Sequence, residues 1–297
     1  MDQASKLREL IKSQNNSKTL ARVITVTSGK GGVGKSSVSV NLALWLRRLG
    51  KRVVILDADF GLANIEVMLG IRPKYNLADL MFKGKALNDI ITEGPEGIGF
   101  ISGGSGIAEL TSLTANQVVY LVQKLCELDQ IADIIIIDTG AGISDNVLEF
   151  VAASEEVLLV ATPEPTSITD AYALLKTLNK KHVDSDKMTV KMIANKVSNE
   201  EEGEELCNKL NIVVKRFLDL NLEFLGAVTM DMAVTKAVMQ QKPFSMIYPN
   251  SPASKSIHEI AGKLCGQEVD ISSMSNKGIT RMFSGIIARI NQRNSKK

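Results

Sequence analysis

The sequence predicts an α/β fold, in which a mostly parallel, twisted sheet of about seven or eight strands carries helices on both faces. Short runs rich in Val and Ile recur between turn residues, and such nearly continuous apolar runs are typical of strands buried on both faces. Patterns of helical length lie between most of these runs, and this alternation favours parallel pairing. The expected strands are 22–27, 52–56, 98–101, 133–137, 157–161, 190–194 and 222–228, and the clearest helices are 35–49, 114–128, 167–178 and 201–217.

The composition is that of one globular domain with short appendages. The chain has 297 residues, 44% of them hydrophobic and 23% charged, with a net charge of +2. So small a net charge gives no reason to expect a nucleic-acid partner. Neither a signal peptide nor a membrane-spanning run is visible, and Cys126, Cys207 and Cys265 lie too far apart for a C-x-x-C metal site. We therefore expect a cytoplasmic protein.

The first predicted strand leads directly into a glycine-rich loop with the spacing G-x-x-x-x-G-K-[ST]. In this strand–loop–helix setting, backbone N–H groups and a helix N-terminus surround phosphate oxygens, while the lysine contacts the β and γ phosphates. Ser36 would offer its hydroxyl to Mg²⁺. The residues expected at the nucleotide are Gly29, Lys30, Gly31, Gly32, Val33, Gly34, Lys35, Ser36 and Ser37.

Carboxylates follow two of the other predicted strands. Asp138 ends a run of four isoleucines, at the place where a phosphate-binding fold holds magnesium through water. Asp57 and Asp59 end the strand at 52–56, where open α/β sheets place their ligands. Two carboxylates in a glycine-containing loop favour a switch that orients the attacking water.

Three segments together resemble the deviant Walker A ATPases of the MinD/ParA class: GKGGVGKS, DADFGLANIEVMLG and IIIIDTGAGI. The resemblance covers nearly the whole chain and implies an ATPase that uses ATP and Mg²⁺ and forms a homodimer only with ATP bound. It also implies that Lys30 is a signature lysine that reaches the partner subunit's phosphates, with catalytic Lys35 acting in its own subunit. By the same resemblance, Asp59 is the catalytic residue that positions water, although Asp57 could share that role. Gly140 stands where many relatives have proline.

The strand at 190–194 is followed by Asn195 and Lys196, which invites comparison with the guanine-reading pattern N-K-x-D. Ser198 replaces the aspartate of that pattern, so the partner for guanine is missing. The family resemblance instead assigns Asn195 to adenine, and it places Asp231 in a second loop near the base.

The C-terminal segment, residues 275–297, is predicted to be a basic amphipathic helix, separate from an ATPase domain at 21–274. Its apolar residues repeat at helical spacing, and six basic residues follow Ser275 without an acid. Such a helix is typical of an anchor on an anionic membrane surface, here the inner face of the cell membrane. The alternative is a last helix packed on the core. The membrane-facing set would be Ile279, Met282, Phe283, Ile286, Ile287 and Ile290.

The N-terminal segment, residues 1–20, looks like a partner-binding element followed by a polar tether. Together with TPEPTSITDAYALLK, it resembles the flagellar-number regulators FlhG/FleN more than division-site MinD. In that family a D-Q-A-x-x-L-R element stimulates a flagellar GTPase of the signal-recognition-particle type. By resemblance, the contact would be made by Asp2, Gln3, Ala4, Leu7 and Arg8.

These features favour an ATP-dependent, membrane-associating dimeric switch that regulates flagellar number and placement. One alternative is a MinD- or ParA-like regulator of cell division or DNA partitioning. Another is a metabolic P-loop enzyme that transfers phosphate or electrons, but the spacing of the cysteines does not resemble that of a shared cluster.

Overall fold

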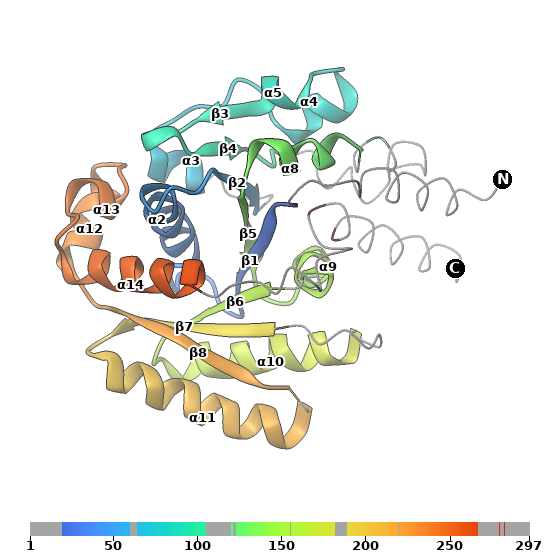
Figure 1. Cartoon of the computed structure of the whole chain (residues 1–297). Coiled ribbons are helices and arrows are strands. Elements are labelled where there is room, and N and C mark those ends of the chain that lie inside the picture. Colours follow the sequence, from blue (N-terminus) through green and yellow to red (C-terminus); the bar gives the residue numbers. More distant parts are fainter. Residues whose placement is uncertain are drawn as a thin grey trace.

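The computed structural model describes residues 20–59, 64–104, 120, 123–154, 156–181, 189–218, 220–266, 279 and 282. Its centre is an eight-stranded sheet in the order β3-β4-β2-β5-β1-β6-β7-β8, shown in Figure 1. Every neighbouring pair is parallel except β3 and β4. The strands are β1 (Arg22–Ser28), β2 (Val53–Ala58), β3 (Ile91–Glu93), β4 (Gly99–Ile101), β5 (Ile134–Ala141), β6 (Glu156–Ala161), β7 (Thr189–Val197) and β8 (Leu222–Thr229).

Helices cover both faces of this sheet (Figure 1). They are α2 (Lys35–Arg48), α3 (Asn64–Leu69), α4 (Leu77–Phe82), α5 (Leu87–Ile90), α8 (Leu128–Ile131), α9 (Asp145–Ala153), α10 (Pro165–Lys181), α11 (Glu200–Leu218), α12 (Met232–Met239), α13 (Phe244–Ile247) and α14 (Pro252–Gly266), with a 3₁₀ turn at Pro95–Gly97. The predicted fold class and all seven expected strands are confirmed. The short antiparallel β3 was missed, because three residues are too few to show a periodicity.

The four isoleucines of β5 pack alternately on the two faces of the sheet. Ile134 and Ile136 pack into the cluster beneath α2 and α14, whereas Ile135 and Ile137 pack on the opposite face with residues of α4, α5 and α8. A third cluster joins α9, α10 and α11 to β6 and β7. Side chains alternate between the faces of a strand, so a strand in the middle layer needs apolar residues at every position.

The order of the strands fixes where a ligand can bind. β1 lies between β5 and β6, so the chain moves to opposite sides of β1 as it continues to β2 and to β6. In open parallel sheets the crevice for ligands lies outside the carboxyl ends of the strands at such a switch point. The loop after β1 and the ends of β2 and β5 meet there.

Candidate nucleotide site

The glycine-rich loop occupies residues 29–34, between β1 and the first residue of α2, Lys35. Gly34 has a φ of 93°, in the left-handed region that glycine adopts freely. A Cβ on Gly34 would also collide with the side-chain amide of Asn195. Glycine is therefore needed at this position for its conformation and for the close approach of β7.

Lys35 and Asp138 form a buried ion pair on the carboxyl side of the sheet. Lys35 Nζ lies 3.4 Å from Asp138 Oδ1, and both side chains are almost fully enclosed. Ser39 donates to the same Oδ1 at 2.7 Å. Ser39 was not predicted as a site residue from the sequence. It follows Lys35 by one helical turn, and residues four apart share a helix face, which is the signal that could have found it.

Two polar atoms of the site are buried without a hydrogen-bond partner among the described residues, Asp138 Oδ2 and Ser37 Oγ. Buried polar groups without partners cost free energy, so a group that binds here gains from satisfying them. A magnesium-bound water suits the carboxylate oxygen, and a phosphate oxygen suits a hydroxyl donor. Ser36, only partly buried in the first turn of α2, offers a hydroxyl nearby. The residues present therefore fit a magnesium–nucleotide complex.

The two aspartates after β2 have different surroundings. Asp57 is the register partner of Asp138 and accepts the backbone N–H of Asp59 at 3.0 Å. Burial, reinforced by the nearby charge of Asp138, raises the pKa of Asp57 to about 8. Asp59 is partly exposed, and its Oδ1 lies 3.4 Å from where a Cβ on Gly140 would stand. Asp57 thus supports the loop from inside, whereas Asp59 is partly exposed beside Gly140.

Asn195 contacts the phosphate loop directly in this structure. Its amide donates to the carbonyl of Val33 at 2.6 Å. The next residue, Lys196, has a φ of 59°, a left-handed conformation that is uncommon for lysine. Its Nζ donates to the carbonyl of Gly32 at 2.8 Å. The end of β7 therefore holds the loop at two carbonyls, and the role of Lys196 was not expected from sequence.

Asp231 caps the N-terminus of α12. Its carboxylate accepts the N–H of Ala233 at 2.8 Å and that of Ala253 at 3.2 Å. Burial opposes ionisation, but these two N–H groups hold the pKa of Asp231 below its ordinary value. The carboxylate thus organises the loop after β8, and its contact with a base stays a prediction.

Lys30 is held by its own subunit. Its Nζ lies 2.6 Å from Glu164 Oε2 and donates to Thr166 Oγ1 at 2.8 Å. Neither partner was singled out from sequence as a lysine contact. The position of Glu164 and Thr166 shortly after β6 could have indicated this contact. The carboxyl end of β6 lies at the same edge of the sheet as the phosphate loop.

The predicted membrane and partner residues fall mostly outside the described residues. Ile279 and Met282 are described, and both are buried in the cluster that contains Leu56 and Ile137. Ser154 Oγ lies 3.8 Å from Met282 Sδ. The docked alternative therefore holds for these two side chains. The rest lie outside the description: Phe283, Ile286, Ile287 and Ile290 of the tail, and Asp2, Gln3, Ala4, Leu7 and Arg8 of the N-terminal segment.

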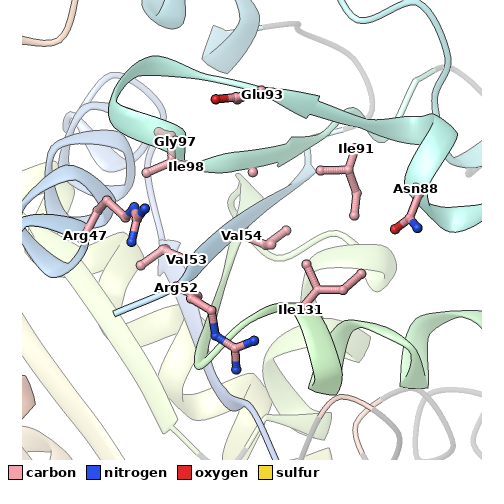
Figure 2. Close-up of a pocket in the computed structure, with 11 residues that line it drawn as sticks. Arg47, Arg52, Val53, Val54, Asn88, Ile91, Glu93, Gly97, Ile98 and Ile131 are labelled. Carbon is pink, nitrogen blue, oxygen red and sulfur yellow. The ribbon is translucent and has the colours of Figure 1, made fainter. Parts of the chain in front are cut away.

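A separate cavity of about 360 Å³ lies at the amino ends of β2 and β4. Figure 2 shows the residues that line it. Arg47 and Arg52 line it together with apolar residues such as Val54 and Ile98. The guanidinium of Arg52 is bound to Asp133 at 2.7 Å. This cavity is far along the strands from the phosphate loop and contains none of the predicted site residues.

The three thiols belong to three different apolar clusters. Cys126 and Cys207 are buried on the face opposite α2, in separate clusters, and Cys265 packs on the cluster beneath α2 and α14. Within the described residues, no three His, Cys, Asp or Glu side chains are grouped to hold a metal ion. This part of the chain also contains no helix both long and apolar enough to cross a membrane.

Comparison with known proteins identifies what this arrangement is similar to. The ParA family model, described as an NUBPL iron-transfer P-loop NTPase, matches residues 19–265. The antiactivator FleN of Pseudomonas aeruginosa is 44% identical over 243 residues, which cover 82% of this chain and 86% of that protein. The flagellum site-determining protein YlxH of Helicobacter pylori is 36% identical and covers 96% of this chain and 98% of its own length.

The same fold occurs in a solved structure of septum site-determining MinD from Pyrococcus horikoshii, complexed with Mg-ADP. That structure superposes with a TM-score of 0.64 and 22% sequence identity over 87% of this chain and the whole of that one. The likeness supports the arrangement of strands and helices around the phosphate loop.

Proposed function

Because the chain belongs to the ParA family of P-loop NTPases, we propose that it is an ATP-hydrolysing switch that regulates the number and placement of flagella. The enzymatic part rests on the buried pair of Lys35 and Asp138 in β5, in which Asp138 Oδ2 has no hydrogen-bond partner among the described residues. The flagellar part rests on similarity to YlxH, at 36% identity over nearly the whole chain.

In the proposed reaction Lys35 binds the β and γ phosphates, and the N–H groups of the loop stabilise the charge that develops during transfer. When bound, Mg²⁺ would neutralise phosphate charge, with Ser36 and Asp138 as its holders, the latter through water. Asp59 orients the attacking water from the partly exposed side of the site. Asn195 and the loop at Asp231 contact the adenine. The reaction releases ADP and phosphate.

The switch part of the proposal is a dimer that forms only with ATP. Lys30 extends from the loop in one subunit to the phosphates bound in the other, as an arginine finger does in trans. Lys30→Ala should therefore remain a monomer with a slowly hydrolysed ATP analogue in light scattering, whereas the unaltered chain dimerises. A normal ATP dimer in this variant would contradict the role given to Lys30.

In this proposal, the two ends of the chain contact the targets of the switch. Residues 1–20 would stimulate a flagellar GTPase of the signal-recognition-particle type, and the basic C-terminal helix would attach the dimer to an anionic membrane. Ile279 and Met282 are buried in this structure, so membrane contact by these two requires the helix to leave the core. Two copies on a dimer bind more tightly than one, because the second attaches at high effective concentration.

A pull-down from a flagellated cell tests the flagellar role. The intact chain should recover the GTPase, and a chain lacking residues 1–20 should not. Thermal melting of both forms checks that the shorter one folds. Equal recovery would remove the N-terminal segment from the proposal.

Removing residues 277–297 should abolish ATP-dependent co-sedimentation with anionic liposomes. The ADP-bound and uncharged-liposome samples are the matched controls, and melting again checks folding because Ile279 and Met282 leave the core. Retained binding would place the membrane contact elsewhere.

A further inference from the structure

The contacts of Lys30 define a docking place within its own subunit. Lys30 Nζ lies 2.6 Å from Glu164 Oε2 and 2.8 Å from Thr166 Oγ1, so one ammonium bonds to two side chains from the start of α10. Ser28 Oγ also donates to the carbonyl of Lys30 at 2.9 Å. Both the backbone and the end of the side chain are thereby fixed.

The backbone of the phosphate loop packs closely against α10. A Cβ on Gly29 would collide with the backbone of Asp170 and Ala171, so only glycine permits this approach. Lys30 follows Gly29 directly and is thereby placed beside the first turn of α10. The contact of Lys30 with Glu164 and Thr166 therefore follows from the path of the backbone after β1, and not only from the length of the lysine side chain.

Glu164 remains favourably placed when Lys30 leaves. The carbonyl of Glu164 accepts the N–H of Ile168 at 3.2 Å, so its carboxylate stands at the N-terminus of α10, where the helix dipole favours negative charge. Lys30 and, more distantly, Lys196 hold the pKa of the Glu164 carboxyl below its ordinary value. The acceptor therefore needs no replacement partner, and the contact can open and close.

We infer that Glu164 and Thr166 form an intrasubunit docking site that holds Lys30 back from the partner subunit until ATP-dependent dimerisation competes it away. This inference rests on the proposed role of Lys30 in trans. The same ammonium cannot bond to Glu164 and Thr166 and also extend to a second subunit's nucleotide. Each dimer must therefore open two such contacts, one per subunit, because the two subunits are identical.

The pair is exposed, with 34% of the Lys30 side chain and 57% of the Glu164 side chain accessible to solvent. Exposed ion pairs are weak, so opening one contact should cost about 1.4- to 5.4-fold in an equilibrium constant. Opening two should weaken the dimer by roughly two- to thirtyfold. The docking site therefore opposes dimerisation only weakly, and the binding of Lys30 to ATP phosphates in the partner subunit can outweigh it.

The first test measures docking without any dimer. Amine acylation of the nucleotide-free monomer, followed by mass spectrometry, should label Lys30 several-fold faster in Glu164→Gln and, to a lesser degree, in Thr166→Val. The matched control is Glu205→Gln, which breaks another exposed pair, Lys209 with Glu205 at 3.1 Å. This control should accelerate Lys209 and leave Lys30 unchanged. Unchanged Lys30 labelling in Glu164→Gln would overturn the docking site.

The second test measures the effect of docking on the affinity of the dimer. With a slowly hydrolysed ATP analogue, sedimentation velocity should show a dimer roughly two- to thirtyfold tighter in Glu164→Gln, a smaller gain in Thr166→Val, and no change in Glu205→Gln. Thr166→Val alters no charge, so its gain separates docking from a general effect of charge on ATP binding. A weaker dimer, or faster labelling without a tighter dimer, would overturn the restraint.

The two proposals fail differently. If Lys30→Ala dimerises normally with ATP, the role in trans is wrong whatever Glu164 does. If Lys30→Ala stays monomeric while Glu164→Gln matches the unaltered chain in labelling and dimerisation, only the docking site is wrong.

Discussion

The two edges of the sheet both gather charge, but they use it differently. At the amino edge, Glu156 is bound by Arg22 at 2.7 Å and by Lys191 at 3.0 Å, and Arg52 pairs with Asp133. At the carboxyl edge, Lys35 lies 3.4 Å from Asp138, and Asp138 Oδ2 has no partner among the described residues. The carboxylates of the first edge are fully paired, whereas the ion pair of the second leaves one buried carboxylate oxygen without a partner among the described residues.

This difference shows how a structural cluster can be told from a site. Arg22 and Lys191 hold the pKa of Glu156 below its ordinary value despite the opposing effect of burial, so that carboxylate is satisfied. Burial instead raises the pKa of Asp57 at the other edge to about 8. Buried charges with complete partners contribute to the fold, and buried groups left incomplete indicate function.

The largest expected effect is on hydrolysis. Asp59→Ala should lower turnover by about a thousandfold while ATP binding is retained, because the variant loses only the group that orients water. Single-turnover assays measure this, beside equilibrium binding of a fluorescent ATP analogue. The control at the other edge is Asp133→Ala, which should hydrolyse normally. Unchanged turnover in Asp59→Ala would remove it from the mechanism.

The next effect is on nucleotide affinity. Lys35→Ala should weaken ATP binding by about a hundredfold, because it removes the buried cation that contacts phosphate. Arg52→Ala removes a cation of the amino edge and should leave affinity unchanged. Titration with the same fluorescent analogue compares the two. Equal losses in both variants would break the distinction between the edges.

A smaller effect separates two buried carboxyls by pH. Burial raises the pKa of Asp57 to about 8 and that of Asp129, which accepts the N–H of Ala21, to about 6. From about pH 4 upward the unfolded chain loses each proton first, so the free energy of unfolding falls until the folded pKa is passed. The loss contributed by Asp57 thus continues to about pH 8, while that of Asp129 ends near pH 6.

Urea unfolding without nucleotide or metal, at several pH values from 5 to 9, measures these slopes. Asp57→Asn should remove the decline up to pH 8, and Asp129→Asn only the decline up to pH 6. Two pKa units correspond to roughly 2–3 kcal/mol, which is the expected difference between the variants at high pH. Parallel curves for both would show that the two carboxyls are equally satisfied.

The sequence was most informative where a pattern is local. The strand runs, the phosphate loop and the end of β5 at Asp138 follow from periodicity and spacing, and the structure has each of them. Contacts between distant segments could not be predicted. Glu164 lies 134 residues after Lys30 in the sequence. The two residues meet because β1 and β6 are neighbours in the sheet. The contact of Asn195 with the carbonyl of Val33 likewise joins segments that are far apart in sequence.

The ambiguous tail shows a different limit. The apolar stripe that contains Ile279 and Met282 has the same spacing whether it meets lipid or protein, because helical periodicity records only that one face is apolar. In the structure these two side chains meet the core. The sequence could state both alternatives, and tertiary packing alone distinguishes them.

The placement of the thiols gives each of the three apolar clusters its own reporter of local opening. Cys126, Cys207 and Cys265 each belong to a different apolar cluster, and burial raises the pKa of Cys207 to about 11, so its thiolate is favoured when its cluster opens to solvent. Rates of thiol modification would therefore follow three separate motions in one unaltered chain. Release of Ile279 and Met282 should accelerate Cys126, which shares their cluster, before either of the other two.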